Sequence, residues 1–342
     1  MMNNKVTLKN VADYVGVSTA TVSYVLNGKQ QSISDETKEA ILNAVKELGY
    51  YPNMNAKELA SNRSQLIGVV VPQTEGDNKS VFANSFYGEI LGSIEREARQ
   101  QGYQVVISCA DLDDNYIRIA YERNLSGIIA IGVYQDEILS KLSETKIPVV
   151  LIDSYCKTQD FDNVRIDDEQ GSYLATSYLI RKGHSRIGFL CGHIQENGVM
   201  QKRFQGYRKA LEEAGINLNP QWIFERKVSF EDGRLAAAHV AKALPEMTGL
   251  VCTADIMAIG LMKGLHAYRV TVPEDLSLIG FDDLEISNYL EPGLTTVHQA
   301  IAEKGAKAFG SLLNEINGNR KQEDIVLPVS IIERESVKEL TR

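Results

Sequence analysis

The sequence predicts a small all-α domain at the N-terminus, followed by an α/β core made of two doubly wound parallel-sheet lobes. The first 50 residues show three short amphipathic patterns separated by glycines. From Leu66 onward, short apolar runs alternate with amphipathic stretches, which is typical of parallel strands linked by helices. A chain of 342 residues has room for two or three packed units.

The N-terminal domain is expected to contain three helices. Their predicted N-caps are Thr7, Ser18 and Ser34, and their predicted stops are Gly16, Gly28 and Gly49. Only Gly16 and Val17 separate the first two helices, so the sequence predicts a helix-turn-helix.

The second of these helices carries small polar residues away from its apolar face. That apolar face consists of Val22, Val25 and Leu26. The residues off this face are Thr19, Ala20, Thr21, Ser23 and Tyr24. Side chains this short can enter the major groove of DNA and touch base edges and phosphates, so we interpret this as a recognition helix. A solvated face on a small helical bundle is the alternative interpretation.

The core contains eight candidate strands and five clear candidate helices. The strands are expected at 66–72, 104–109, 127–131, 148–153, 164–166, 186–191, 250–253 and 276–281, and the helices at 89–101, 171–182, 203–214, 232–244 and 256–268. These strands are too many for one compact sheet, and residues 155–163 form a polar break. We therefore expect two lobes with a ligand cleft at the carboxyl ends of their strands.

Composition and charge exclude several classes of protein. The 44% hydrophobic content is that of a globular chain, and the apolar run at 66–71 is far shorter than the roughly 20 residues of a membrane span. The N-terminus lacks the apolar stretch of an export signal. The net charge is −9, but residues 1–63 carry +1, so any DNA contact is expected in the N-terminal domain.

Neither a metal site nor a catalytic centre is predicted. The four cysteines and five histidines are scattered without metal-ligand spacing, and cysteines of this kind fit a reducing cytoplasm. The doublets Asp167–Asp168 and Asp282–Asp283 invite comparison with a carboxylate-pair hydrolase, but neighbouring residues at a strand end point to opposite sides. Phosphate-loop, nucleophile-elbow and dinucleotide motifs are absent from the sequence, so we expect neither an enzyme nor a cofactor.

Two segments, "VTLKNVADYVGVSTATVSYVLNG" and "ISDETKEAILNAVKELGYYPN", resemble the DNA-binding domain of the lactose/galactose-repressor (LacI/GalR) family of bacterial transcription regulators. The resemblance continues through "GSYLATSYLIRKGHSRIGFL", "RFQGYRKALEEAG", "DIMAIGLMKGL", "VPEDLSLIGFDD" and "LEPGLTTVHQ", so it covers essentially the whole chain. It implies a DNA-binding domain at 1–52, a hinge helix at 53–64 and an effector-binding, dimerising core at 65–342.

The resemblance also assigns the contacts with DNA. A homodimer would bind a near-palindromic operator, and each hinge would insert a leucine into the minor groove, which kinks the duplex. The residues that take these roles are Thr7, Ser18, Thr19, Ala20, Thr21, Ser23, Tyr24, Asn27, Asn53, Ala56 and Leu59. Leu59 is the wedge, although a flexible linker with an incidental leucine is the alternative. Tyr24 stands where an arginine is common in the family, so the operator sequence stays open.

For the core, the resemblance implies the type I periplasmic-binding-protein fold, in which the chain crosses three times between two lobes. We expect these crossings near 154–163, 289–295 and 327–329. The first lobe would then contain residues 65–153 and 295–326, and the second 164–289 and 328–342. The C-terminal "SVKELTR" lacks the leucine heptads of a tetramer-forming tail, which favours a dimer.

Candidate effector-binding residues lie around this cleft. By resemblance, Arg203 would bind hydroxyls or carboxylates, Asp282 would accept ligand hydrogen bonds, and Phe86 and Tyr87 would stack on a ring. The alternatives are structural roles: Arg203 pairs with a helix carboxylate, Asp282 caps a turn, and one of the two rings belongs to the hydrophobic core. Weaker candidates are Asp153, Asn197, Asp255 and Gln299.

Together these expectations describe a cytoplasmic, homodimeric repressor of a carbohydrate-use operon that responds to a sugar or sugar phosphate. Its partners would be double-stranded operator DNA and the effector, with no membrane contact. Ala254 and Ile301 depart from sugar-binding relatives and leave the ligand open. A transport-type sugar-binding protein is the main alternative, but such a protein would need an export signal and no recognition helix.

Overall fold

The computed structural model describes residues 6–26, 33–51, 64–71, 81–108, 114–134, 136–155 and 160–340. The chain forms two compact units, Met1–Ser64 and Gln65–Arg342. Each unit is described by itself below. Within the described ranges, no helix is both long and apolar enough to cross a bilayer.

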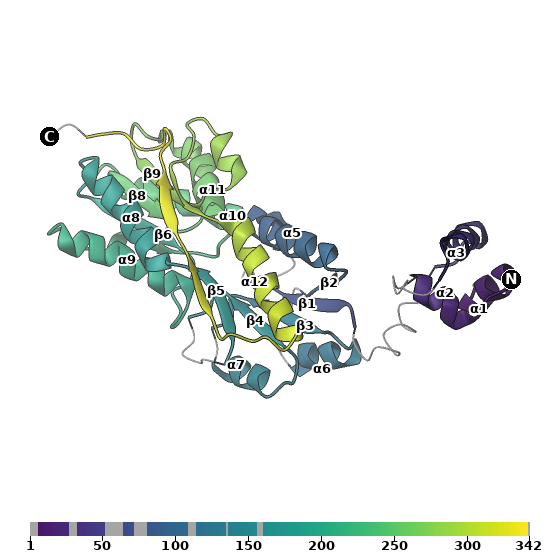
Figure 1. The fold of residues 1–342 in the computed structure, drawn as a ribbon. Helices are drawn as coiled ribbons and strands as arrows, with labels where there is room; N and C mark the ends of the chain where they lie inside the picture. The colour runs from purple at the N-terminus through teal and green to yellow at the C-terminus, as the bar shows by residue number, and fades with distance from the viewer. Residues whose placement is uncertain are drawn as a thin grey trace. The chain divides into compact units, whose positions relative to one another are not determined.

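The first unit is a three-helix domain with α1 at Leu8–Val15, α2 at Thr19–Leu26 and α3 at Asp35–Leu48 (Figure 1). Thr7 caps α1 in a reciprocal capping box with Asn10, and the Ser34 hydroxyl caps α3. Gly16 has a φ of 76°, the left-handed conformation that ends α1 one residue before the turn into α2. The helices enclose one small core of Val11, Ala12, Val22, Val25, Ile41, Ala44 and Tyr50.

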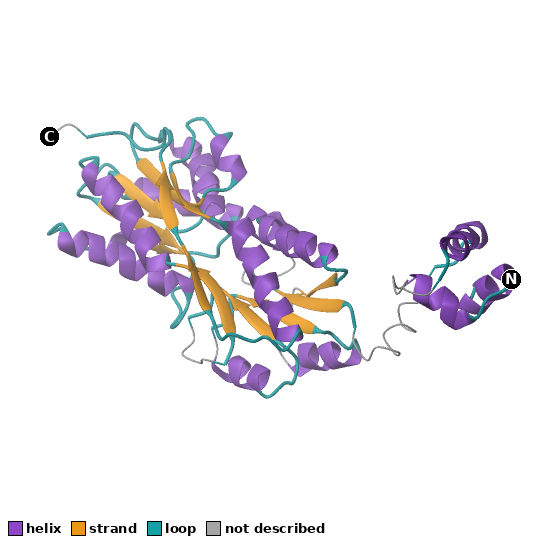
Figure 2. Ribbon diagram, viewed as in Figure 1, coloured by secondary structure: helices purple, strands orange, loops and turns teal. Residues whose placement is uncertain are grey.

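The first lobe of the core is a six-stranded, all-parallel sheet (Figure 2). Its strands, in spatial order, are β11 (Asp324–Leu327), β5 (Asp162–Ile166), β4 (Val149–Ile152), β3 (Gly127–Ile131), β1 (Leu66–Val70) and β2 (Gln104–Ser108). Its helices are α5 (Ser85–Gln100), α6 (Asp114–Glu122), α7 (Asp136–Ser143) and α12 (Ile301–Ile316), with the short η1 (Val81–Ala83) before α5.

Apolar alternation along the central strands explains why helices cover both faces of this sheet. In β3, Ile129 and Ile131 pack in the cluster that includes α5 and α12, whereas Ile128 and Ala130 pack in the cluster of α6 and α7. All five residues of β3 are buried, as expected for a parallel strand between two helical layers.

The second lobe has six strands in the spatial order β12 (Val329–Ile332), β10 (Thr296–Gln299), β9 (Ser277–Asp282), β8 (Gly249–Cys252), β6 (Ile187–Cys191) and β7 (Ile223–Glu225). Only β12 is antiparallel, against β10. Two helix pairs pack on this lobe, α8 (Asp168–Arg181) with α9 (Val199–Glu213), and α10 (Phe230–Lys242) with α11 (Asp255–Leu265). Short helices lie at η2 (Pro220–Trp222), η3 (His266–Tyr268) and η4 (Glu285–Asn288).

The strand pairings correct two of the three expected crossings between the lobes. Residues 162–166 form β5 of the first sheet, so the chain leaves the first lobe at 166–168 and not at 154–163. Residues 296–299 form β10 of the second sheet, so the return occurs at 299–301 and not at 289–295. Both strands are short, and their positions are set by pairing with neighbours distant in sequence. The third crossing runs from β11 to β12 across Pro328.

Candidate functional site

The predicted recognition helix presents an exposed face of small residues. In α2, Thr19, Ala20 and Tyr24 are exposed, whereas Val22 and Val25 are buried against the other two helices. Ser23 is half-buried on the same side as Thr19 and Ala20, because residues four apart share a helix face. The ring of Tyr24 is 51% exposed, so a large polar-tipped side chain is available to a partner.

Three of the predicted DNA contacts also hold the helix ends. The Ser18 hydroxyl accepts a hydrogen bond from the Thr21 amide at 3.0 Å and lies 2.8 Å from the Thr21 hydroxyl. Thr7 caps α1. Their side chains therefore stabilise the ends of α1 and α2. Asn27, Asn53, Ala56 and Leu59 lie outside the described residues.

In the core, the carboxyl ends of several parallel strands bring polar side chains together between the lobes. Asp153 directly follows β4 and Asp168 begins α8 just after β5, whereas Asp282 ends β9 and Gln299 ends β10. The sequence places these residues up to about 150 positions apart, yet parallel strands deliver them to one end of each sheet.

A buried lysine joins the two lobes through this group. Lys304, in the first turns of α12, is fully buried, and its Nζ lies 2.7 and 2.8 Å from the two carboxylate oxygens of Asp153. The same Nζ donates to Oε1 of Gln299 at 2.8 Å, and Nε2 of Gln299 donates to Oδ1 of Asp282 at 2.6 Å. We call Asp153, Lys304, Gln299 and Asp282 the interlobe chain, because its first two members belong to the first lobe and its last two to the second.

Arg203 is held next to this chain by a second set of contacts. Its Nε donates to Oδ1 of Asp168 at 2.8 Å, and its guanidinium lies 3.6 Å from the ring centroid of Phe281. The Tyr155 hydroxyl donates to the other oxygen of Asp168 at 2.6 Å. Arg203 also donates to the carbonyl of Thr253, whose own buried hydroxyl has no hydrogen-bond partner among the described residues. Arg203 thus does pair with a helix carboxylate, as the alternative interpretation stated.

Aromatic rings line the first-lobe side of the site. Phe86 and Tyr87 are half-buried at the start of α5, with ring centroids 5.2 Å apart in an edge-to-face arrangement. Lys304 Nζ lies 5.6 Å from the ring centroid of Phe86. Burial and the nearby carboxylate of Asp153 raise the pKa of Tyr134, which also interacts with Tyr87 and Arg203. The rings are therefore near both the lysine and the arginine.

The carboxyl group of Asp282 has a raised pKa. Burial raises its pKa to about 8, although Arg203, Gln299 and Lys304 act to lower it. Its φ of 124° is rare for a residue with a side chain. A carboxyl group that keeps its proton near neutral pH can donate as well as accept a hydrogen bond.

Two predicted residues do not join this arrangement. Asp255 is fully buried, and its oxygens accept hydrogen bonds from Ser287, Thr296 and the Leu284 amide, so it fixes the turn after β9. Asn197 is half-exposed in the loop before α9, and its amide donates to Gln201. These contacts tie Asp255 and Asn197 to neighbouring protein groups, and their contact with the ligand stays a prediction.

Sequence reasoning missed Lys304, Asp168, Tyr155 and Tyr134. Lys304 had a detectable signal, because it occupies a core position of an amphipathic helix, between Ile301 and Ala308. Asp168 follows a strand end, where ligands are expected, but in the sequence it stands out only as half of an aspartate doublet. Within the described ranges, no group of three or more His, Cys, Asp or Glu side chains could hold a metal ion.

Comparisons with known proteins agree with this architecture. Residues 7–53 match the model described as bacterial regulatory proteins, lacI family, and residues 176–337 match the periplasmic binding protein-like domain. The HTH-type transcriptional repressor PurR of Vibrio cholerae is 35% identical over 343 residues, covering 98% of this chain and 99% of that protein. PurR of Haemophilus influenzae is 33% identical over 346 residues, with the same coverage of both chains.

Solved structures lead to the same family. The lac repressor dimer bound to operator and the anti-inducer ONPF is 28% identical, covers 98% of this chain and 100% of its own, and superposes with a TM-score of 0.83. A complex of the regulator CelR with cellobiose is also 28% identical, covers 97% of this chain and 100% of its own, and has a TM-score of 0.72. These relatives are transcription regulators and not enzymes, in agreement with the sequence. The chain belongs to the lacI family of bacterial regulatory proteins and is a DNA-binding transcriptional repressor with a ligand-binding core.

Proposed function

We propose that the chain is a homodimeric repressor of the bacterial cytoplasm. Its affinity for a near-palindromic operator would be controlled by a small molecule bound between the core lobes. The exposed face of α2 is the observation that carries the DNA-binding half of this proposal. Thr19, Ala20, Ser23 and Tyr24 would contact base edges and phosphates, and Leu59 of each hinge would enter the minor groove.

The interlobe chain is the basis for control by an effector. Two hydrogen-bonded links join the lobes here, Lys304 to Gln299 and Tyr155 to Asp168. A ligand that bonds to Asp282 or Arg203 would replace or add to these links and so favour one lobe arrangement over another. Since a ligand shifts an equilibrium only by its differential affinity for the two states, these links are where that difference would arise.

The groups around the site fit a neutral polar ring compound. Asp282 can donate or accept at neutral pH, and Phe86, Tyr87 and Tyr134 offer ring faces. The Thr253 hydroxyl, beside Arg203, has no hydrogen-bond partner in the described part of the chain. The relatives named PurR favour a purine-related ligand and operon over the expected carbohydrate. Sugars remain the second candidate, because a similar regulator from Enterococcus faecium was solved with bound ribose and CelR with cellobiose.

Binding-site selection from a random duplex pool tests the DNA-binding half. We expect the full-length protein to enrich one near-palindrome, and light scattering to give twice the chain mass. Tyr24→Ala should weaken binding to that duplex in a fluorescence anisotropy titration. Leu42→Ala is the matched control, because Leu42 is 53% exposed on α3, outside the helix-turn-helix. Failure to enrich any duplex, or equal operator affinities of the two variants, would show that α2 does not recognise DNA through Tyr24.

Thermal-shift screening against purine bases, nucleosides, sugars and sugar phosphates tests the effector half, because a ligand that binds the native state raises the melting temperature. We expect a specific shift with one purine-related compound. A shift with sugars alone would restore the carbohydrate operon, whereas no shift with any of these compounds would contradict control by a polar ring compound.

A further inference from the structure

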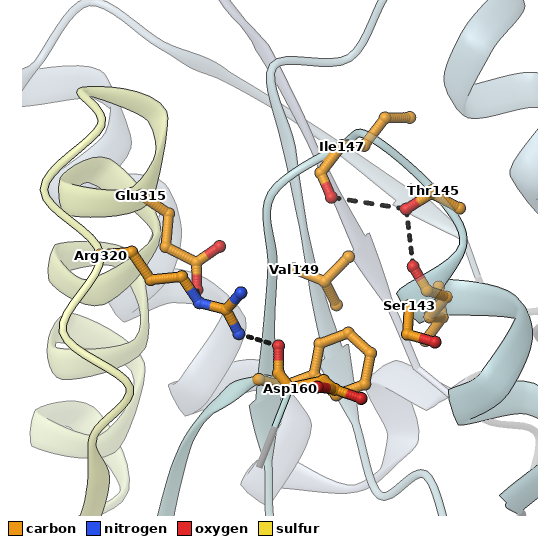
Figure 3. Close-up of a pocket in the computed structure, with 9 residues that line it drawn as sticks. Ser143, Thr145, Ile147, Val149, Asp160, Glu315 and Arg320 are labelled. Atoms are coloured by element: carbon orange, nitrogen blue, oxygen red, sulfur yellow. Dashed lines mark hydrogen bonds and ion pairs between the residues drawn. The ribbon is translucent and has the colours of Figure 1, made fainter. Parts of the chain in front are cut away.

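A cavity lies in the first lobe (Figure 3), and none of the residues of the interlobe chain lines it. Its volume is about 310 Å³, near the lower end of the range for small-molecule sites. Val149, the first residue of β4, forms part of its wall, so the cavity lies at the amino end of the parallel strands. Asp153, by contrast, follows the carboxyl end of β4. The two sites are therefore at opposite ends of the sheet.

One carboxylate oxygen in this cavity is buried and accepts no hydrogen bond from the described residues. The Glu315 side chain, near the end of α12, is only 7% exposed, and its Oε1 has no hydrogen-bond partner among the described residues. Nε of Arg320 lies 3.6 Å from Oε1, so the two charges form an ion pair, but the distance is too long for a hydrogen bond. A buried acceptor without a hydrogen bond costs free energy, and a ligand that supplies a hydrogen-bond donor would recover it.

The cavity combines acidic charge with an apolar wall. Asp160 and Glu315 contribute two carboxylates and Arg320 one guanidinium, so the lining carries a net charge of −1 when both acids are ionised. Arg320 donates to the Asp160 carbonyl and its side chain is 40% exposed, so much of its charge faces solvent. Ile147, Val149 and Phe161 line the same cavity. This combination suits a cation with an apolar body.

We propose that this cavity binds a small organic amine, whose ammonium group donates a hydrogen bond to Oε1 of Glu315 while its apolar part packs against Ile147, Val149 and Phe161. The ammonium group would form a charge-assisted hydrogen bond with Glu315 in a partly desolvated cavity, where hydrogen bonds of this kind are strong. This site is additional to the effector site and does not depend on the effector being identified.

The proposal carries its own pH signature. Burial raises the pKa of Glu315 to about 7 and the charge of Asp162 raises it further, whereas Arg320 and backbone hydrogen bonds from Val149 and Asp162 lower it. The other ionisable groups that line the cavity are Asp160, which is exposed, and Arg320 itself. Because an ammonium ion binds the ionised carboxylate, affinity should rise about tenfold between pH 6 and pH 8, as the ionised fraction of Glu315 grows. A ligand without a charge would show no such rise.

Calorimetric titration of the full-length protein with benzylamine, and with benzyl alcohol as its neutral counterpart, tests this site. We expect benzylamine to bind at pH 8 at least about tenfold more tightly than benzyl alcohol. Glu315→Gln should remove that preference. Glu303→Gln is the matched control, because Glu303 is exposed at the opposite end of the same helix, and it should bind benzylamine as the wild type does.

Several results would overturn the proposal. These are equal binding of benzylamine and benzyl alcohol by the wild type, a flat pH profile, or equal binding by the two glutamate variants. The first two comparisons use the wild type only, so they decide the question even if Glu315→Gln folds poorly. None of them uses operator DNA, so failure here leaves the proposed repressor function intact.

Discussion

Replacing Lys304 with methionine would test the interlobe chain most severely. Methionine keeps much of the side-chain volume but removes the cation that neutralises the Asp153 carboxylate. Asp153 is only 8% exposed. Two short hydrogen bonds to that carboxylate are lost, together with the bond to Gln299. Removing one partner of a buried ion pair costs about 3–5 kcal/mol, so we expect the free energy of unfolding of the core to fall by about that amount.

Urea unfolding followed by tryptophan fluorescence measures this loss. Trp222 is the only tryptophan and lies in the second lobe, so the signal reports on the core and not on the N-terminal domain. Lys307→Met is the control, because Lys307 is exposed on the same helix and should change stability by less than about 0.5 kcal/mol. Adding Asp153→Asn to Lys304→Met should recover much of the loss, because no unpaired charge then remains.

Either of two results would contradict the expected stabilisation of the core by the Lys304–Asp153 pair. If Lys304→Met and Lys307→Met unfold at the same urea concentration, the buried Lys304–Asp153 pair does not stabilise the core as its burial implies. If the double variant is as unstable as Lys304→Met alone, the loss does not come from an uncompensated Asp153 charge.

Three further predictions concern the effector, pH and the hinge. Asp282→Ala should abolish the effector-induced change in operator affinity without weakening operator binding, and an unchanged ligand titration would remove Asp282 from the site. Burial raises the pKa of Asp282 to about 8 and of Asp255 to about 6, so the native core keeps protons that the unfolded chain has released. Stability should therefore fall as pH rises from about 4 to about 8, by up to about 1.4 kcal/mol per pH unit for each retained proton, and Asp282→Asn should flatten the upper part of that slope in urea titrations. Leu59→Ala should weaken operator binding but not effector binding, and an equal gel-shift midpoint would reject the wedge.

Local pattern is enough to predict most strands and every described α-helix except α6, α7 and α12. Capping residues such as Thr7 and Ser34, and apolar runs such as 127–131, carry their signal within a few positions, so the structure agrees with the sequence there. The strands β7, β10, β11 and β12 are not predicted by local pattern. Each has three or four residues, and β10 is set by pairing with β9 and β12.

The site is only partly predictable for the same reason. Strand ends and resemblance identify Asp153, Arg203, Asp282 and Gln299, but not how they are paired. The bond from Lys304 to Asp153 joins residues 151 positions apart, and that from Arg203 to Asp168 joins residues 35 apart. No periodicity in a single sequence encodes such partners. Asp255 shows the same limit, because its three hydrogen-bond donors lie 29 to 41 positions away in the sequence. Its contact with the ligand stays a prediction.

Operator affinity measured with and without bound effector would show whether the interlobe site controls DNA binding. The full-length protein would be titrated against its selected duplex by fluorescence anisotropy, with calorimetry confirming that the effector is bound. If the interlobe site controls DNA binding, the effector should change operator affinity by about 5- to 150-fold, the usual range of coupling between two sites. An operator affinity that stays the same while the effector saturates the core would contradict the account.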